Sequence, residues 1–306
     1  MSKKLKNPAK LKKPLLQEIN FSTQKVVSYS QYSNYAQCAH KWYLTSVEKK
    51  KSPPNIHMVF GTSMHFVLQE YLKQVYAISG TAADKMDWID IFENKFQEEY
   101  KLQYAQNNHI HFSSAEEMEE FYDDGVAIIE WFRKHRKEYF TTRNCYLIGC
   151  EIPLQVEVKK NILFVGYIDL VLYDVDLDKI IIYDFKTSTK GWNKWNKADD
   201  TKLSQILMYK KYFSELYEFP IEKIGVEFLI LKRKAIADEW HEFPKRIQVV
   251  RPVDGKIKIK KAISNFTEFL DNSFDDEGKP LIKEHIKNIS KLCNYCIFNN
   301  TPDCIK

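Results

Sequence analysis

The chain has 306 residues, of which 44% are hydrophobic and 28% are charged, and it carries a formal net charge of +5. This length suits one large domain or two modest ones, and the apolar content excludes a globally disordered protein. The apolar runs are short and flanked by charges, so no membrane span of about 20 apolar residues is expected. The basic N-terminus lacks the apolar region of a secretory signal, which favours a cytoplasmic protein.

Residues 1–25 contain Lys, Pro and Asn without periodicity and indicate a flexible basic arm. Two further basic stretches follow, one of which is interleaved with tryptophan. Taken singly, each run is explained by solvated surface lysines, but together they favour phosphate contacts and base stacking with a nucleic acid. The three stretches contain Lys3, Lys4, Lys6, Lys10, Lys12 and Lys13; Lys190, Lys194 and Lys197 beside Trp192 and Trp195; and Lys256, Lys258, Lys260 and Lys261.

Residues 26–140 are predicted to be helical, because apolar residues recur there at helical spacing. Ser114 and Glu117 have the spacing of a capping box ahead of the last of these helices. Pro53 and Pro54 separate the first helix from the second. The four expected helices cover residues 28–47, 56–76, 82–104 and 114–139, to within a few residues.

After about residue 140 the pattern becomes that of a sheet. Three runs rich in Val, Ile, Leu, Phe and Tyr are separated by short polar turns, which predicts a three-stranded antiparallel meander. A helix, two strands and a last helix follow, so an α/β or α+β fold with one central sheet is expected. The expected strands cover 146–158, 162–173, 179–185, 224–231 and 246–250, and the expected helices about 200–217 and 255–270.

Two acidic residues and a lysine are embedded in the apolar strands. Asp184 and Lys186 lie two residues apart in one strand and therefore point to the same face, and Asp169 can lie opposite them across the hairpin. A carboxylate in such a place is costly unless it is paired or bound to a metal. Two converging carboxylates suit Mg²⁺ or Mn²⁺, which can stabilise charge on a scissile phosphate. For the D-x-K alone, a structural Asp–Lys pair is the alternative explanation.

Other residues accompany this pattern in a fixed order. His65 follows Gly61 in a G-x-x-x-H sequence at the start of a helix, and Glu151 lies on the first strand of the meander. Gln205 and Tyr209 are four residues apart on the next helix and face one way. Singly, these residues are explained by packing or by an ordinary helix surface. As an ordered set they favour a catalytic site.

The set resembles the RecB-like exonuclease branch of the PD-(D/E)XK nuclease superfamily, over roughly residues 28–304. The resemblance implies an α/β fold with a restriction-endonuclease-like central mixed β-sheet flanked by helices and a helical N-terminal region. It also implies a metal-dependent DNA nuclease, an exonuclease acting in recombination, repair or processing. The expected parts are the basic arm (1–25), a helical region contributing His65 and Cys38 (26–140), the nuclease core (141–290) and a Cys-bearing tail (291–306).

The resemblance also implies a role for each matching residue. His65, Asp169, Asp184 and the carbonyl of Phe185 would bind the catalytic metal, Mg²⁺ or Mn²⁺. Lys186 would act on the nucleophilic water. The residues that would support the site or contact DNA are Gln205 and Tyr209, together with Glu151, which matches an acidic position of the family.

Four of the six cysteines have the spacing of a metal centre. Cys293 and Cys296 form a C-x-x-C, Cys304 follows, and Cys38 can complete a Cys₄ set. The spacing suits either Zn²⁺ or an iron–sulfur cluster. The resemblance extends to CRISPR-associated adaptation nucleases and AddAB-type nuclease domains, and it implies a [4Fe–4S] cluster with a structural role. This sequence departs from those families by Ala39 in place of a proline and by a longer gap before Cys304.

No segment has the G-x-x-x-x-G-K-[ST] pattern of a helicase motor. The expected protein is therefore either a stand-alone nuclease acting on DNA ends or single strands, or a subunit with a helicase or recombination partner. The alternatives are a catalytically inactive nucleic-acid-binding scaffold and a zinc-finger-like binding protein that functions through its Cys tail. The compact length and Lys/Asn-rich composition are compatible with a bacteriophage protein acting in the host cytoplasm.

Overall fold

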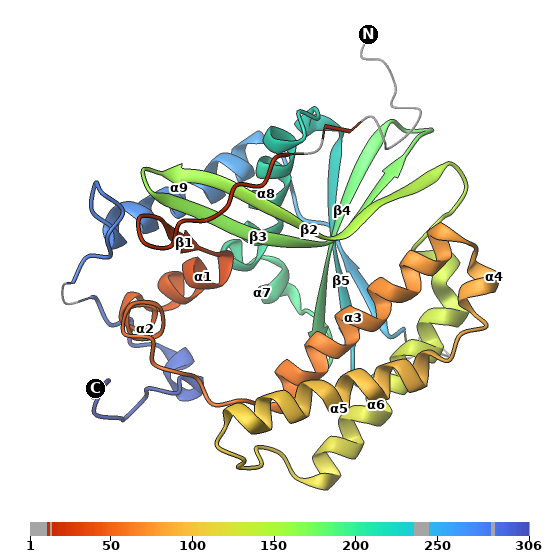
Figure 1. Cartoon of the computed structure of the whole chain (residues 1–306), viewed down its shortest axis with the longest axis horizontal. Coiled ribbons are helices and arrows are strands. Elements are labelled where there is room, and N and C mark those ends of the chain that lie inside the picture. The colour runs from red at the N-terminus through yellow and green to blue at the C-terminus, as the bar shows by residue number, and fades with distance from the viewer. Residues whose placement is uncertain (1–10, 13, 236–244, 283–284, 306) are drawn as a thin grey trace.

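The fold is described by a computed structural model that covers residues 11–12, 14–235, 245–282 and 285–305 (Figure 1). Within them, a central mixed β-sheet carries helices on both faces, so the expected α/β class with a helical N-terminal region is confirmed. Its strands are β1 (Lys25–Val27), β2 (Cys145–Lys159), β3 (Ile162–Asp174), β4 (Lys179–Ser188), β5 (Ile224–Lys232) and β6 (Ile247–Val250). Its α-helices are α1 (Tyr29–Gln37), α2 (Ala39–Trp42), α3 (Ile56–Ala77), α4 (Gly80–Ala83), α5 (Trp88–Gln106), α6 (Ala115–His135), α7 (Lys194–Lys197), α8 (Asp200–Leu216) and α9 (Lys256–Ser273).

The sheet contains the antiparallel β2–β3–β4 meander expected from the sequence. Strand β5 lies parallel to β4, and α8 crosses between them, as a parallel pair requires a crossover connection. Strand β6 closes one edge antiparallel to β5, whereas β1 lies parallel to the start of β3. Strand β1 was not predicted, because three residues are too few to show an alternating pattern.

Helix boundaries follow from local capping. The Ser114 hydroxyl accepts a hydrogen bond from the Glu117 N–H at 3.1 Å, so the predicted start of α6 is confirmed. The prediction of a single helix at 28–47 is wrong in one respect. Cys38 has extended backbone and separates α1 from α2, and a π-helical turn (Tyr43–Val47) follows α2 directly. The helix expected from residue 82 begins at Trp88, where Asp87 caps it after the short α4.

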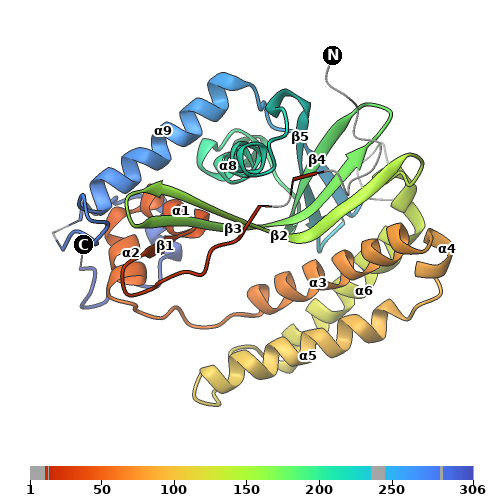
Figure 2. The ribbon, with the colours of Figure 1, turned by 45° about the horizontal axis from the view of Figure 1, so that its top comes forward.

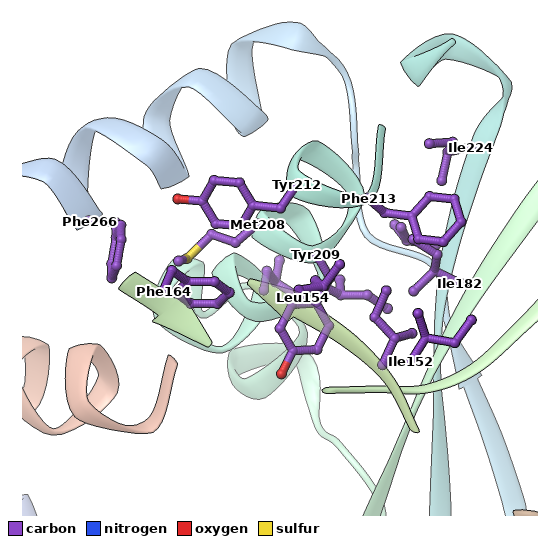
Figure 3. Packing of buried hydrophobic residues seen from close by; sticks show 14 of the residues in the cluster. Ile152, Leu154, Phe164, Ile182, Met208, Tyr209, Tyr212, Phe213, Ile224 and Phe266 are labelled. Carbon is purple, nitrogen blue, oxygen red and sulfur yellow. The ribbon is translucent and has the colours of Figure 1, made fainter. Parts of the chain in front are cut away.

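Two hydrophobic cores lie on opposite faces of the sheet (Figure 2). On one face, α8 and α9 pack Met208, Phe213 and Phe266 against Phe164 and Ile182 (Figure 3). On the other face lie α3, α5 and α6. Burying each such side chain contributes about 1.5–3 kcal/mol, so packing fixes the helices on both faces. No helix in the described ranges has both the length and the apolarity to cross a membrane.

A gap in the strand pairing of β3 positions the acidic residues. Along one edge, β3 pairs with β1 at residues 162–164 and with β4 at residues 170–174. Residues 165–169 of β3 have neither strand beside them on that edge. The sheet therefore opens next to Asp169.

Candidate active site

Strands β3 and β4 diverge where the acidic residues lie. Their ladder ends at the Leu170–Tyr183 pair, one residue before Asp169 and Asp184 would face each other. Beyond that point the Asp169 Oδ2 accepts a hydrogen bond from the Phe185 N–H at 2.6 Å. Like charges directly opposite each other destabilise a ladder, which accounts for the divergence. Asp169 thus contacts β4 through its side chain and not through backbone pairing.

Asp184 is the most deeply buried acid of the site, with 2% of its side chain exposed. Lys186 Nζ lies 2.7 Å from its Oδ2, yet this oxygen has no hydrogen bond of acceptable geometry. Burial raises the pKa of Asp184 even though Lys186 is close. Besides its ion pair with Lys186, this buried carboxylate oxygen suits a hard divalent cation as a further partner.

His65 and Asp169 form the second half of the arrangement. His65 Nδ1 lies 3.5 Å from Asp169 Oδ1, and the imidazole packs edge-on against the Phe185 ring. Burial alone would raise the pKa of Asp169, but His65, Lys186 and the Phe185 N–H together lower it. Burial likewise opposes protonation of His65, and Asp169 raises its pKa on balance. The structure therefore brings His65, Asp169, Phe185 and Lys186 together.

These donors suit a divalent metal by chemistry, although they are not preassembled around one point. Among the residues that the structure describes, no group of three or more His, Cys, Asp or Glu side chains is spaced as a metal site. Asp169 and Asp184 supply carboxylate oxygens and His65 an imidazole, a donor set that Mg²⁺ and Mn²⁺ accept. The oxygen of Asp184 that lacks a hydrogen bond is the observation that supports a cation there.

A cleft of about 770 Å³ opens over Asp169. Glu151 lines it from β2 and adopts φ of +51°, a left-handed conformation that costs a non-glycine residue about 1 kcal/mol or more. The buried Gln69 of α3 donates to Glu151 Oε1 at 2.5 Å and to the Asp169 carbonyl at 3.3 Å. Gln69 was not predicted from the sequence, because a single glutamine in an amphipathic helix gives no signal of a site.

Gln205 and Tyr209 lie together on α8 as predicted from their spacing. Gln205 Nε2 donates to the Tyr209 hydroxyl at 3.2 Å, and both residues line the cleft. The Tyr209 ring packs in the core beside Leu154, while its hydroxyl points away from Met208 and Phe213 (Figure 3). Burial raises the pKa of Tyr209, so its hydroxyl stays protonated at neutral pH.

The start of α1 forms a wall of the cleft that was not predicted. Ser28, Tyr29 and Gln31 line it, and the Tyr29 hydroxyl donates to the Thr201 carbonyl at the start of α8 at 3.0 Å. Burial raises the pKa of Tyr29, and the nearby Asp184 adds to this shift. Lys95 of α5 lines the same cleft. None of these residues belongs to a recognisable motif.

The four predicted cysteines line one separate cavity of about 120 Å³. Cys38, at the end of α1, thus meets Cys293, Cys296 and Cys304 although more than 250 residues separate them. Burial raises the pKa of Cys304, and the three other thiols add to the shift. Cys145 and Cys150 lie outside this cavity, on β2.

Backbone groups already point at two of these sulfurs. The Asn288 N–H donates to Cys38 Sγ at 3.5 Å, and the Ser290 N–H donates to Cys293 Sγ at 3.5 Å. The Asn288 side chain also donates to the Gln37 carbonyl at 2.9 Å and holds this segment against the end of α1. N–H donors of this kind stabilise thiolates, the form that binds metals.

Comparison with known proteins gives one informative match. A family model described as the PD-(D/E)XK nuclease superfamily matches residues 26–301. No curated protein matches the chain. A solved structure titled "Crystal structure of SSO0001" is similar at 12% identity with a TM-score of 0.29, over 88% of this chain and 93% of that one. Similarity at that level carries no argument about function.

Proposed function

The chain belongs to the PD-(D/E)XK nuclease superfamily, and from that premise we propose that it is a metal-dependent DNA nuclease. We assign it to the RecB-like exonuclease type, acting on DNA ends or single strands during recombination, repair or DNA processing. Family membership supports phosphodiester hydrolysis and a nucleic-acid substrate. The finer assignment rests on the order of His65, Asp169, Asp184-x-Lys186 and Gln205-x-x-x-Tyr209 along the chain.

The observation that carries the proposal is the state of Asp184. Its side chain is 2% exposed, and the ammonium of Lys186 lies 2.7 Å from its Oδ2 without the geometry of a hydrogen bond. Burial opposes ionisation of Asp184 and raises its pKa even with Lys186 beside it, so the ionised carboxylate gains from a second cation. Binding of a cation by Asp184 and Asp169 would supply that partner.

Each residue has a chemical role in this proposal. Asp169, Asp184, His65 and the Phe185 carbonyl would hold the cation, which stabilises charge on the scissile phosphate and makes a water more acidic. The Lys186 ammonium, which lies 2.7 Å from Asp184, would orient the attacking water and offset phosphate charge.

The remaining cleft residues would act on the substrate and its surroundings. Gln205 and Tyr209 present an amide and a hydroxyl to the cleft and can donate to phosphate oxygens. The Glu151 carboxylate accepts from Gln69, which orients it toward the cleft beside Asp169. Glu151 would assist the metal or the water from this position.

A digestion series tests the proposal. Purified protein is incubated with Mg²⁺ or Mn²⁺ and with linear, circular, single-stranded and double-stranded DNA, and with RNA of matched sequence. Cleavage that requires the metal and that disappears in Asp184→Ala supports a nuclease. Activity of wild type on linear DNA but not on circular DNA identifies an exonuclease. If wild type binds DNA but cleaves none of these substrates, the proposal is wrong and a binding scaffold is the better description.

We further propose that Cys38, Cys293, Cys296 and Cys304 hold a [4Fe–4S] cluster with a structural role. The convergence of four thiols on one cavity supports a shared metal centre. In the described part of the chain, no three of these sulfurs are spaced to hold a metal ion, so the choice of a cluster over a single Zn²⁺ rests on the resemblance to cluster-bearing nucleases. Visible absorbance with iron and sulfide assays on anaerobically purified protein tests this, and zinc without iron contradicts it.

A further inference from the structure

A short segment between β4 and α8 presents a tryptophan to solvent. Trp195 of α7 is 72% exposed, and Lys194 Nζ lies 4.9 Å from the centre of its ring. Most tryptophans are largely buried, because a large apolar ring in water is unfavourable. The exposure of this indole therefore requires an explanation. Either the segment that carries it is mobile, or the ring is exposed because it binds a ligand.

The segment before α7 is held firmly to the sheet. The Trp192 N–H donates to Gln248 Oε1 at 2.7 Å, and Gln248 Nε2 returns a hydrogen bond to the Trp192 carbonyl at 3.1 Å. The Trp192 ring packs against Phe228 with ring centres 4.9 Å apart. Trp192 thus acts as an anchor in the core.

Helix α7 itself is fixed by side-chain caps. Asn193 Oδ1 accepts hydrogen bonds from the N–H groups of Trp195 and Asn196, each at 3.0 Å. Lys202 Nζ donates to Asn196 Oδ1 at 2.6 Å and ties α7 to α8. Trp195 is therefore exposed on a fixed support, which lowers the entropy cost of binding to it.

The lysines around Trp195 also differ from two of the lysines in the α9 stretch. Lys190, Lys194 and Lys197 are exposed, and none forms an ion pair with a carboxylate in the described ranges. In contrast, Lys258 and Lys261 of α9 are both paired with Asp200. The positive charge beside Trp195 therefore remains available to an anionic ligand.

Along the chain, this segment connects two elements of the proposed active site. It follows directly after Lys186 in β4 and precedes Gln205 in α8, both of which belong to the site. The Thr201 carbonyl, four residues beyond Lys197, accepts the hydrogen bond from Tyr29 at the cleft wall. In the view of Figure 1, α7 appears between α1 and β5.

We propose that Trp195 is a stacking platform for an unpaired nucleobase, and that Lys190, Lys194 and Lys197 contact the phosphates of the same strand. Bases in the interior of a duplex have both faces stacked on their neighbours, so such a base must be unpaired before it can stack on an indole. The substrate class would then be DNA with a single-stranded segment at the cleft. This inference rests on the proposed function only for cleavage of the bound strand. Binding of the strand by Trp195 does not depend on the proposed function.

Binding without cleavage tests the platform. Fluorescence anisotropy in EDTA is measured with a labelled single-stranded oligonucleotide and with a blunt duplex of two complementary strands of the same length. Trp195→Ala is expected to weaken single-strand binding by about tenfold or more, the effect of losing one stacked base, and to change duplex binding by less than about twofold. Trp195→Phe keeps a ring and is expected to retain most of the affinity.

Two controls separate stacking from general effects. Tyr146→Ala removes another exposed aromatic residue, 44% exposed, at the start of β2 and far along the sheet from Lys186; it should bind both substrates like wild type. Replacing Lys190, Lys194 and Lys197 by Gln should reduce the slope of log affinity against log salt by about 2 for single strands. Thermal unfolding should be unchanged in all these surface variants.

Two results would overturn the proposed platform. In the first, Trp195→Ala binds single strands with the affinity of wild type. In the second, it loses the same amount of affinity for single strands and for duplex. These outcomes are separate from the fate of the proposed function. If wild type cleaves no DNA and Trp195→Ala still loses single-strand affinity, the nuclease proposal fails and the platform stands. If wild type cleaves DNA and Trp195→Ala binds normally, only the platform fails.

Discussion

The carboxylate cleft and the cysteine cavity are built in opposite ways. Asp169, which lines the cleft, and Asp184 on β4 lie on central strands, are buried, and are restrained by His65, Lys186 and the Phe185 N–H. In the cavity, the four thiols lie at the end of a short helix and in a C-terminal segment with little regular structure. The packed strands hold the acids in place, whereas the Cys38 and Cys293 sulfurs are held by a few backbone contacts.

This difference indicates where each site draws its stability. The hydrophobic core sustains the cleft, and its charged groups reduce the stability that the core provides. The cavity is bordered by exposed residues such as Tyr295 and Leu292, so a bound metal group would contribute most of its folding energy. Substitution of a residue at the cleft should therefore reduce catalysis, whereas substitution of a cysteine at the cavity should reduce stability.

The largest expected effect is the loss of cleavage in Lys186→Ala. Without the ammonium next to Asp184, the phosphate charge and the attacking water lose their nearest cation, and cleavage should fall by about 10³-fold. Initial rates on labelled DNA with Mg²⁺ measure this. The matched control is Lys179→Ala, which removes an exposed lysine at the start of the same strand and should cleave like wild type. Equal activity of the two variants would contradict the proposed role.

The second prediction concerns Cys38→Ser. The proposed metal centre would join Cys38 to the C-terminal segment and close a loop of most of the chain, so its loss should reduce the free energy of unfolding by about 2–4 kcal/mol. Urea unfolding and limited proteolysis of the C-terminal segment measure the effect. Cys145→Ala, a buried thiol outside the cavity, should keep the full metal content. A Cys38→Ser protein with unchanged metal content would contradict a Cys₄ centre.

The third prediction is that the two acids respond in opposite directions when metal is absent. Burial raises the pKa of Asp184 from 3.8 to about 6, so the folded state holds a proton that the unfolded state releases within this range. Metal-free stability therefore falls as pH rises through the range, and Asp184→Asn should be more stable at pH 7, by on the order of 1–3 kcal/mol.

Asp169 gives the matched comparison. Its pKa is lowered by His65, Lys186 and the Phe185 N–H, so its ionised form stabilises the fold at neutral pH and that contribution disappears as pH falls. Asp169→Asn should therefore be less stable than wild type at pH 7. Urea titrations in EDTA at pH 7 and below pH 4 measure the stability of both variants. If neither variant, or both, were more stable than wild type at pH 7, the two acids would not have opposite effects on stability.

The smallest expected effect is that of Gln69→Ala. Gln69 donates to Glu151 and to the Asp169 carbonyl, so its loss should leave both acids less well positioned and reduce kcat about tenfold with little change in KM. Gln74→Ala, a half-buried glutamine on the same helix, is the control. A wild-type kcat in Gln69→Ala would show that Glu151 needs no positioning.

Much of the fold was predictable because its signals are local. Apolar periodicity predicted the helices and the meander, and the Ser114 cap predicted the start of α6. The D-x-K spacing predicted that Asp184 and Lys186 share one face, because side chains alternate along a strand. The interruption at Cys38 was not predicted, because nothing in the neighbouring residues signals extended backbone there.

The amino-acid sequence by itself determined which residues could carry the chemistry and in what order they occur. Only the tertiary structure decided that β3 and β4 diverge at Asp169, that Gln69 reaches Glu151, and that the start of α1 borders the cleft. It also brought Cys38 into one cavity with three distant thiols. Capping and periodicity depend on residues a few positions apart, whereas these contacts depend on how two hydrophobic cores pack helices onto one sheet.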